Sequence, residues 1–168
     1  MKPLRFFLTA AGINLALFLI IYLMPFNPIR SLIGYSTSLF AFLFERGLAV
    51  AVVSSKNACI LATSTGNLSL YQTFYEFLTI LALTIPLYLH SWKKLLEKSV
   101  LAMLIMWGYY VLLYGLTILF LENGLNVPWL LRFIRFNTES FMIPAFGALW
   151  FFLNKDRILS LIASWKRQ

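Results

Sequence analysis

The residues of this chain with the clearest chemical potential gather around a Ser-Thr-Gly triplet, Ser64 to Gly66, in the stretch "ACILATSTGNLSLYQTFYEFL". Cys59, the single cysteine, lies five residues before the triplet, and Glu76 follows it inside an apolar run. A serine or cysteine nucleophile needs a base that takes its proton and a donor that stabilises the oxyanion. Ser64 and Cys59 are therefore the candidate nucleophiles for an acyl-transfer reaction.

The candidate partners of such a nucleophile lie elsewhere in the chain. Glu76 or Glu139 could act as the base if burial raised its pKa. Arg132 or Arg135 could hold a carboxylate or an oxyanion, and these two arginines and Glu139 are spaced to share one helix face. The common structural interpretation is that arginines anchor a helix at the membrane interface and that Ser64 caps a helix.

Glu76 is also a candidate binding residue. An ionised carboxylate in hydrocarbon costs several kcal/mol, so this side chain should face protein or water and have a partner. Gln72 lies one turn before Glu76 on the same helix face. Together with Arg135, these two residues could bind a substrate or take part in proton transfer. The alternative is a structural hydrogen bond between Glu76 and an arginine.

Metal and cofactor chemistry have little support in the sequence. His90 is the only histidine, and with a single cysteine no internal disulfide or cysteine cluster can form. We therefore expect neither a metal nor a cofactor.

The composition defines the class of protein. The 168 residues are 61% hydrophobic and 12% charged, and the mean hydropathy is +0.81, well above that of a soluble domain. The net charge of +8 would suggest nucleic acid in a soluble protein, but here the basic residues lie at the ends of apolar runs. We expect membrane lipids and other membrane proteins as partners, and no nucleic acid.

The apolar runs predict an all-α polytopic membrane protein that forms a single integral membrane domain over residues 1–168. Residues 29–44 are expected to be interfacial or re-entrant, and residues 48–64 to form a short extracytoplasmic β-hairpin around the polar turn "SSKN". Residues 156–167 predict an amphipathic tail helix. About four membrane spans are expected, at residues 6–24, 70–90, 99–121 and 138–153.

The distribution of lysine and arginine predicts the orientation in the cell membrane. With four spans and a cytoplasmic N-terminus, nine of the fourteen basic residues lie on the cytoplasmic side and five on the other. Both termini are therefore predicted to be cytoplasmic, with the Ser-Thr-Gly triplet outside and His90 inside.

The order of these parts resembles the core of the exosortase and archaeosortase family. The similarity runs from Leu39 to Lys94, "LFAFLFERGLAVAVVSSKNACILATSTGNLSLYQTFYEFLTILALTIPLYLHSWKK". The resemblance implies a membrane cysteine transpeptidase that processes C-terminal sorting signals, with a catalytic cysteine, arginine and histidine. In that family the cysteine precedes a Ser/Thr-Gly pair at the mouth of a span.

The catalytic residues of that family are not intact in this chain. Ser64 stands where the nucleophilic cysteine would be, followed by the expected Thr65 and Gly66. The next span, "MWGYYVLLYGLTILFLENG", has no arginine, and the last outer segment offers Asn137 and Glu139 but no histidine. The sequence therefore favours a non-catalytic subunit or assembly partner of a membrane complex on a degraded exosortase-like scaffold. The alternative is an active membrane peptidase or transpeptidase.

Overall fold

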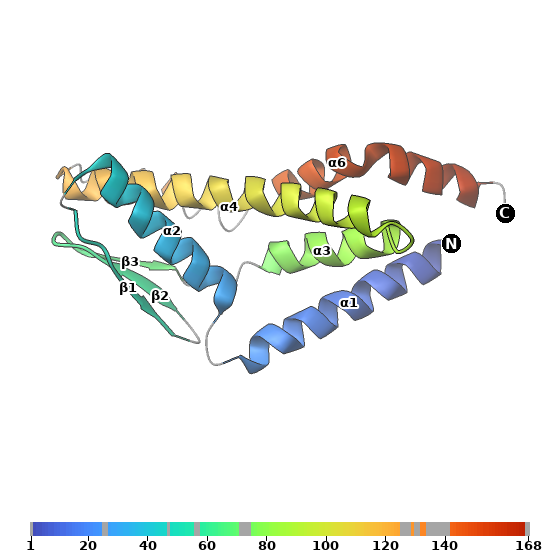
Figure 1. Cartoon of the computed structure of the whole chain (residues 1–168), viewed down its shortest axis with the longest axis horizontal. Helices are drawn as coiled ribbons and strands as arrows, with labels where there is room; N and C mark the ends of the chain where they lie inside the picture. The colour runs from blue at the N-terminus through green and yellow to red at the C-terminus, as the bar shows by residue number, and fades with distance from the viewer. Residues whose placement is uncertain are drawn as a thin grey trace. The chain divides into compact units, whose positions relative to one another are not determined.

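The computed structural model describes residues 2–24, 27–46, 48–55, 58–70, 75–124, 129, 132–133 and 142–166. This part of the chain is mostly helical, with one small antiparallel sheet (Figure 1). The helices are α1 (Pro3–Leu23), α2 (Pro28–Phe44), α3 (Tyr75–Leu87), α4 (Trp92–Glu122) and α6 (Met142–Trp165). The strands are β1 (Ala51–Ser54), β2 (Cys59–Ala62) and β3 (Asn67–Leu70).

The residues cluster into two compact units. One unit contains residues 1–20, 75–106 and 142–168, and the other contains residues 21–74 and 107–141. Helix α4 thus contributes its first half to one unit and its second half to the other. We call them the helical unit and the sheet unit.

In the helical unit, α3 packs against α6, and a small core forms around Phe6, Leu87, Tyr88 and Leu95. The apolar side chains at the end of α6 complete this core, and the ring of Trp165 lies 6.2 Å from that of Phe6. The predicted tail at 156–167 is therefore the continuation of the same helix that contains much of the predicted last span. Ile158, Leu161 and Trp165 of this tail are partly buried against the core, whereas Leu159 and Ile162 are exposed.

In the sheet unit, α2 covers one face of a three-stranded sheet whose order is β1-β2-β3. Asn27 caps α2, because its side-chain oxygen accepts hydrogen bonds from the backbone N–H groups of Ile29 and Arg30, each at 3.1 Å. The helix is tied to β1 through the hydroxyls of Ser31 and Ser54, which lie 2.5 Å apart.

The prediction of a hairpin at 48–64 is correct for two strands and misses the third. Strands β1 and β2 pair as predicted, with Ser54 opposite Cys59 across the polar turn. Residues 67–70, predicted as the entry to a span, instead form β3 and pair with β2, with Ala62 opposite Asn67. The stretch "NLSL" alternates polar and apolar residues, which indicates a strand, but it is only four residues long and lies directly before the apolar run assigned to the span.

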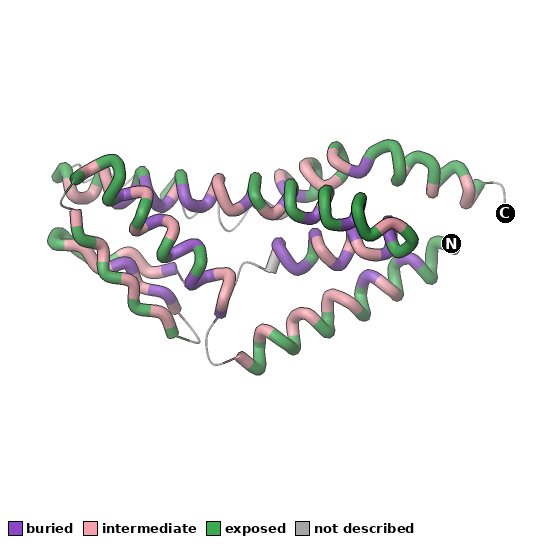
Figure 2. Tube along the Cα trace, viewed as in Figure 1, coloured by how far each residue is buried: buried purple, intermediate pink, exposed green. Residues whose placement is uncertain are grey.

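Two described helices, α1 and α4, are long and apolar enough to cross a membrane. Most of their side chains are not buried by other parts of the described chain (Figure 2). The four predicted spans are not confirmed. Helix α3 has 13 residues, which at 1.5 Å per residue is about 20 Å and shorter than a bilayer core of about 30 Å. Helix α6 carries the polar stretch "NKDR" at its centre.

Candidate functional site

The Ser-Thr-Gly triplet forms the turn between β2 and β3, so the prediction that Ser64 caps a helix is wrong. The backbone N–H and the hydroxyl of Thr63 both donate to the carbonyl of Gly66, each at 2.9 Å, and close this turn. We call residues 63–66 the Ser-Thr turn. Ser64, Thr65 and Gly66 of this turn are exposed.

The Ser-Thr turn holds the carboxylate of Glu122, the last residue of α4. The hydroxyl of Ser64 donates to Oε2 at 2.6 Å. The hydroxyl of Thr65 donates to Oε1 at 2.8 Å, and the backbone N–H of Thr65 donates to the same oxygen at 3.2 Å. Both carboxylate oxygens are therefore occupied by donors from one turn, and we call this arrangement the carboxylate clamp.

These donors change the proton affinity of Glu122, which directly follows the predicted span 99–121. The hydrogen bond from Ser64, with those from Thr63 and Thr65, lowers the pKa of this carboxyl group from 4.5 to about 2. A base this weak is badly matched to the proton of a serine hydroxyl near neutral pH. The carboxylate clamp links the turn between β2 and β3 to the end of α4.

The clamp compensates an unfavourable charge at the end of α4. A carboxylate at a helix C-terminus faces the negative end of the helix dipole, so Glu122 needs donors from outside the helix. The helix ends at Glu122, and two residues later Gly124 has a φ of +70°, a conformation that glycine adopts without strain. Beside it, the Asn123 side chain donates to Leu119 O at 2.8 Å and to Glu45 at 3.4 Å.

Cys59, the second candidate nucleophile, is buried at the centre of the sheet unit. A Cβ atom added at Gly34 of α2 would lie 2.6 Å from its Sγ, which shows how closely helix and strand approach. Burial raises the pKa of the Cys59 thiol, and the nearby charge of Arg30 only partly opposes this shift. The thiol is therefore protonated and inaccessible, in contrast to a reactive cysteine.

Two of the other predicted site residues, Glu76 and Arg132, lie in the described part of the chain. Glu76 lies in the first turn of α3 rather than two turns into a span, where a carboxylate is favoured by the helix dipole. Arg132 is exposed. Gln72, Arg135 and Glu139 lie outside the described residues.

Sequence reasoning missed Glu122, the partner of Ser64. The two residues are 58 positions apart in the chain, and Glu122 directly follows the predicted span 99–121. One signal could have pointed to it: an acidic residue at the end of a long apolar helix needs compensation.

The described residues contain no group of three or more histidine, cysteine or acidic side chains that could hold a metal ion. The chain finds no match among models of protein families, curated proteins or solved structures. Fold and site thus define a coarse class, a mostly helical protein with two candidate membrane-spanning helices and a three-stranded antiparallel sheet. The resemblance to exosortases stays a prediction.

Proposed function

We propose that this chain is a non-catalytic subunit or assembly partner of a membrane complex, built on an exosortase-like scaffold. It crosses the cell membrane several times, with both termini in the cytoplasm. Its partners are membrane lipids and other membrane proteins.

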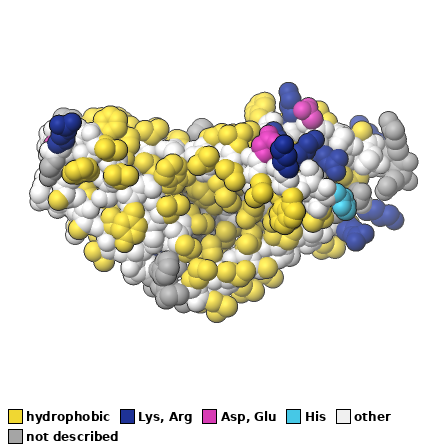
Figure 3. Space-filling model, in the orientation of Figure 1, with side chains coloured by type: hydrophobic (Ala, Val, Ile, Leu, Met, Phe, Trp, Pro, Cys, Tyr) yellow, Lys and Arg dark blue, Asp and Glu magenta, His cyan; other side chains and the backbone are white. Residues whose placement is uncertain are grey.

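The observation that carries this proposal is the exposed apolar surface. Apolar side chains cover much of the visible face (Figure 3). The buried residues of α2 lie on the side of the helix that contacts the sheet. The other side is apolar and more than half exposed at each of Leu32, Tyr35, Leu39, Phe42 and Leu43. A continuous apolar face of this size needs lipid or a protein partner to cover it.

The state of the candidate nucleophiles supports a non-catalytic role. The hydroxyl of Ser64 is hydrogen-bonded to a carboxylate of low pKa, and the thiol of Cys59 is buried. A carboxylate of such low pKa is a weak base for the Ser64 proton, and burial keeps a substrate away from the Cys59 thiol.

The test is recovery of the complex from membranes of the native host. We expect the tagged full-length protein to resist alkaline carbonate extraction and to co-purify with defined membrane proteins in a mild detergent. The double variant Leu39→Ser/Phe42→Ser on α2 should reduce this recovery several-fold. The matched variant Leu15→Ser/Leu19→Ser, on the exposed face of α1, should keep it. A wild-type protein that is monomeric and alone would contradict the proposal.

The 2.6 Å contact between Ser64 and Glu122 favours one alternative, a membrane peptidase or transpeptidase, because a nucleophile and its base lie at such a distance. In this alternative, Ser64→Ala or Cys59→Ala stops the processing of a tagged membrane substrate. Ser55→Ala is the matched control for Ser64→Ala, since Ser55 closes the other turn of the same sheet through its hydroxyl. Unchanged processing in both nucleophile variants excludes the alternative.

A further inference from the structure

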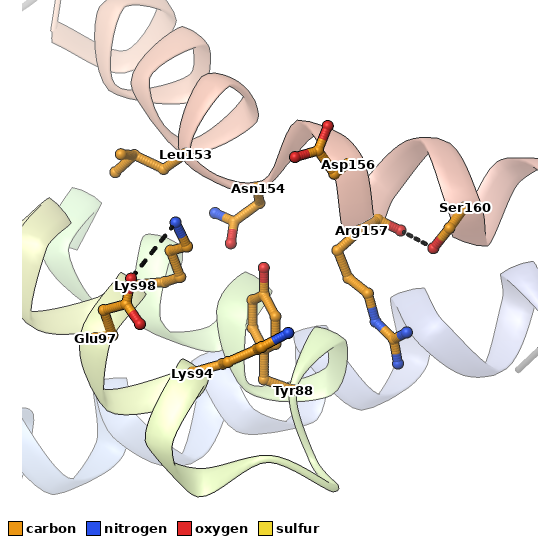
Figure 4. A pocket seen from close by; sticks show the side chains of 9 residues that line it. All are labelled: Tyr88, Lys94, Glu97, Lys98, Leu153, Asn154, Asp156, Arg157 and Ser160. Atoms are coloured by element: carbon orange, nitrogen blue, oxygen red, sulfur yellow. Dashed lines mark hydrogen bonds and ion pairs between the residues drawn. The ribbon is translucent and has the colours of Figure 1, made fainter.

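The helical unit contains a polar pocket of about 420 Å³ where α4 and α6 meet the residue after α3 (Figure 4). This volume lies in the range of pockets that bind small ligands. Its wall contains Tyr88, Lys94 and Lys98 on one side and Asn154 and Arg157 on the other. A smaller pocket of about 150 Å³ shares Tyr88, Lys94 and Arg157 and extends to His90.

The cationic groups of the pocket are only partly neutralised. Lys98 lies 3.9 Å from Glu97, a distance at the limit of an ion pair, and its side chain is 28% exposed. The Nε of Arg157 donates to the carbonyl of Leu87 at 3.1 Å, which fixes the guanidinium group. With Lys94, three cations face two acids, Glu97 and Asp156, so the lining has an excess of positive charge.

Asn154 gives the pocket a second kind of recognition group. This residue is only 2% exposed, and its amide nitrogen donates to Trp150 O at 2.8 Å. Its Oδ1 atom has no hydrogen-bond partner in the described structure. Figure 4 shows this side chain extending toward Tyr88 and the pocket. A buried acceptor without a donor is costly, so the site is suited to a ligand that brings one.

We propose that this pocket binds a phosphate ester that carries a hydroxyl or amine donor beside the phosphate. Lys94, Lys98 and Arg157 bind the phosphate, and Oδ1 of Asn154 accepts from the donor. The same chemistry occurs in a phospholipid headgroup and in a free phosphate ester, and basic pockets between membrane helices bind such headgroups. The proposal stands independently of any protein partner or catalytic role.

The test uses the purified full-length protein in an uncharged detergent. The probes are short-chain phosphatidylglycerol, which carries hydroxyl donors, and short-chain phosphatidylmethanol, which has the same charge and no donor. Free glycerol 3-phosphate serves as the soluble competitor. Binding of the lipids is measured by native mass spectrometry and by the thermal shift of the protein.

The lysine variants test the phosphate site. Lys94→Gln/Lys98→Gln should weaken phosphatidylglycerol binding about tenfold or more, because two charge-assisted hydrogen bonds are lost. The matched pair Lys93→Gln/Lys155→Gln removes the same charge from exposed positions outside the pocket and should change binding less than about twofold. Equal losses in the two pairs, or no binding by the unaltered protein, would overturn the proposal.

The two remaining comparisons test the donor and the source of the phosphate. The unaltered protein should prefer phosphatidylglycerol over phosphatidylmethanol several-fold, and Asn154→Leu should abolish this preference. Equal binding of both lipids by the unaltered protein would overturn the role of Asn154. Displacement of the lipid by glycerol 3-phosphate supports a free phosphate ester as ligand, and lipid binding without displacement supports a headgroup.

Discussion

Two polar clusters of this molecule differ in how far their hydrogen-bonding and charged groups are paired within the protein. In the carboxylate clamp, three donors from Ser64 and Thr65 meet the two oxygens of Glu122. In the pocket of the helical unit, Lys94 has no acid paired within ion-pair distance, and Oδ1 of Asn154 has no partner in the described structure. The clamp is internally satisfied, whereas the pocket is open to a ligand.

This difference shows that a reactive residue type is a poor guide to a reactive site. Ser64 stands in the motif that resembles a catalytic one, yet its hydroxyl donates to Glu122, a carboxylate whose lowered pKa makes it a weak base. Asn154 belongs to no motif, and its amide oxygen lacks a partner. Hydrogen-bond satisfaction, which follows from the fold, separates the two clusters.

The largest expected effect concerns the access of reagents to the sheet unit. Cys59 is buried with a raised pKa, so a maleimide should label it at least about 100-fold more slowly than a cysteine placed in the exposed turn. The comparison variant is Ser64→Cys in a Cys59→Ala background, and the readout is the labelling rate by intact mass. Similar rates would show that the sheet unit is not closed over Cys59.

The next effect tests the close approach of α2 and β2. Gly34→Leu should destabilise the protein by about 1–3 kcal/mol or more, because its Cβ would lie 2.6 Å from Cys59 Sγ and 3.2 Å from a methyl carbon of Val52. Gly12→Ala in α1 is the control, since nothing lies within 4 Å of the added Cβ. The measurement is thermal unfolding in detergent. Equal unfolding temperatures for both variants would contradict this packing.

A smaller effect depends on pH. The pKa of Glu122 is lowered from 4.5 to about 2, so the clamp contributes its full stability above pH 4.5 and loses it as the pH falls toward 2. Glu122→Gln removes this charge. The unfolding temperature of the wild type should exceed that of the variant by a few degrees at neutral pH, and the gap should close below pH 4.5. A constant gap would exclude the charge as the cause.

The smallest effect is expected in the open pocket. Asn154→Leu removes a buried acceptor without a partner and also a hydrogen bond to Trp150 O, so the two changes oppose each other. We expect the stability to change by less than about 1 kcal/mol. A loss similar to that of Gly34→Leu would show that Asn154 is a structural residue and that the pocket is not open.

Much of the helical fold could be predicted from the apolar runs. The predicted span 6–24 and the predicted helix 29–44 correspond closely to α1 and α2. Helix α4 starts earlier than the predicted span 99–121, because "WKKLLEK" consists of good helix formers despite its charge. Helix α6 joins the predicted last span to the tail for a related reason, since no helix-breaking residue separates them.

The candidate site was only half predictable. Local sequence indicated the turn around Ser64, but its partner in the clamp, Glu122, lies 58 residues away, and only the packing of the sheet unit brings them together. The pocket depends likewise on a contact between distant elements, with Tyr88 and Asn154 contributed by separate helical regions. Such pairs have no signature in the spacing of a single sequence.

We propose that Ser64 has a structural role in the carboxylate clamp and no catalytic one. The most direct measurement compares Ser64→Ala, Glu122→Gln and the double variant for thermal stability and for processing of a tagged membrane substrate in the native host. We expect both single variants to lower the unfolding temperature, the double variant to lower it little further, and processing to be unchanged in all three. Loss of processing in Ser64→Ala at an unchanged unfolding temperature would contradict it.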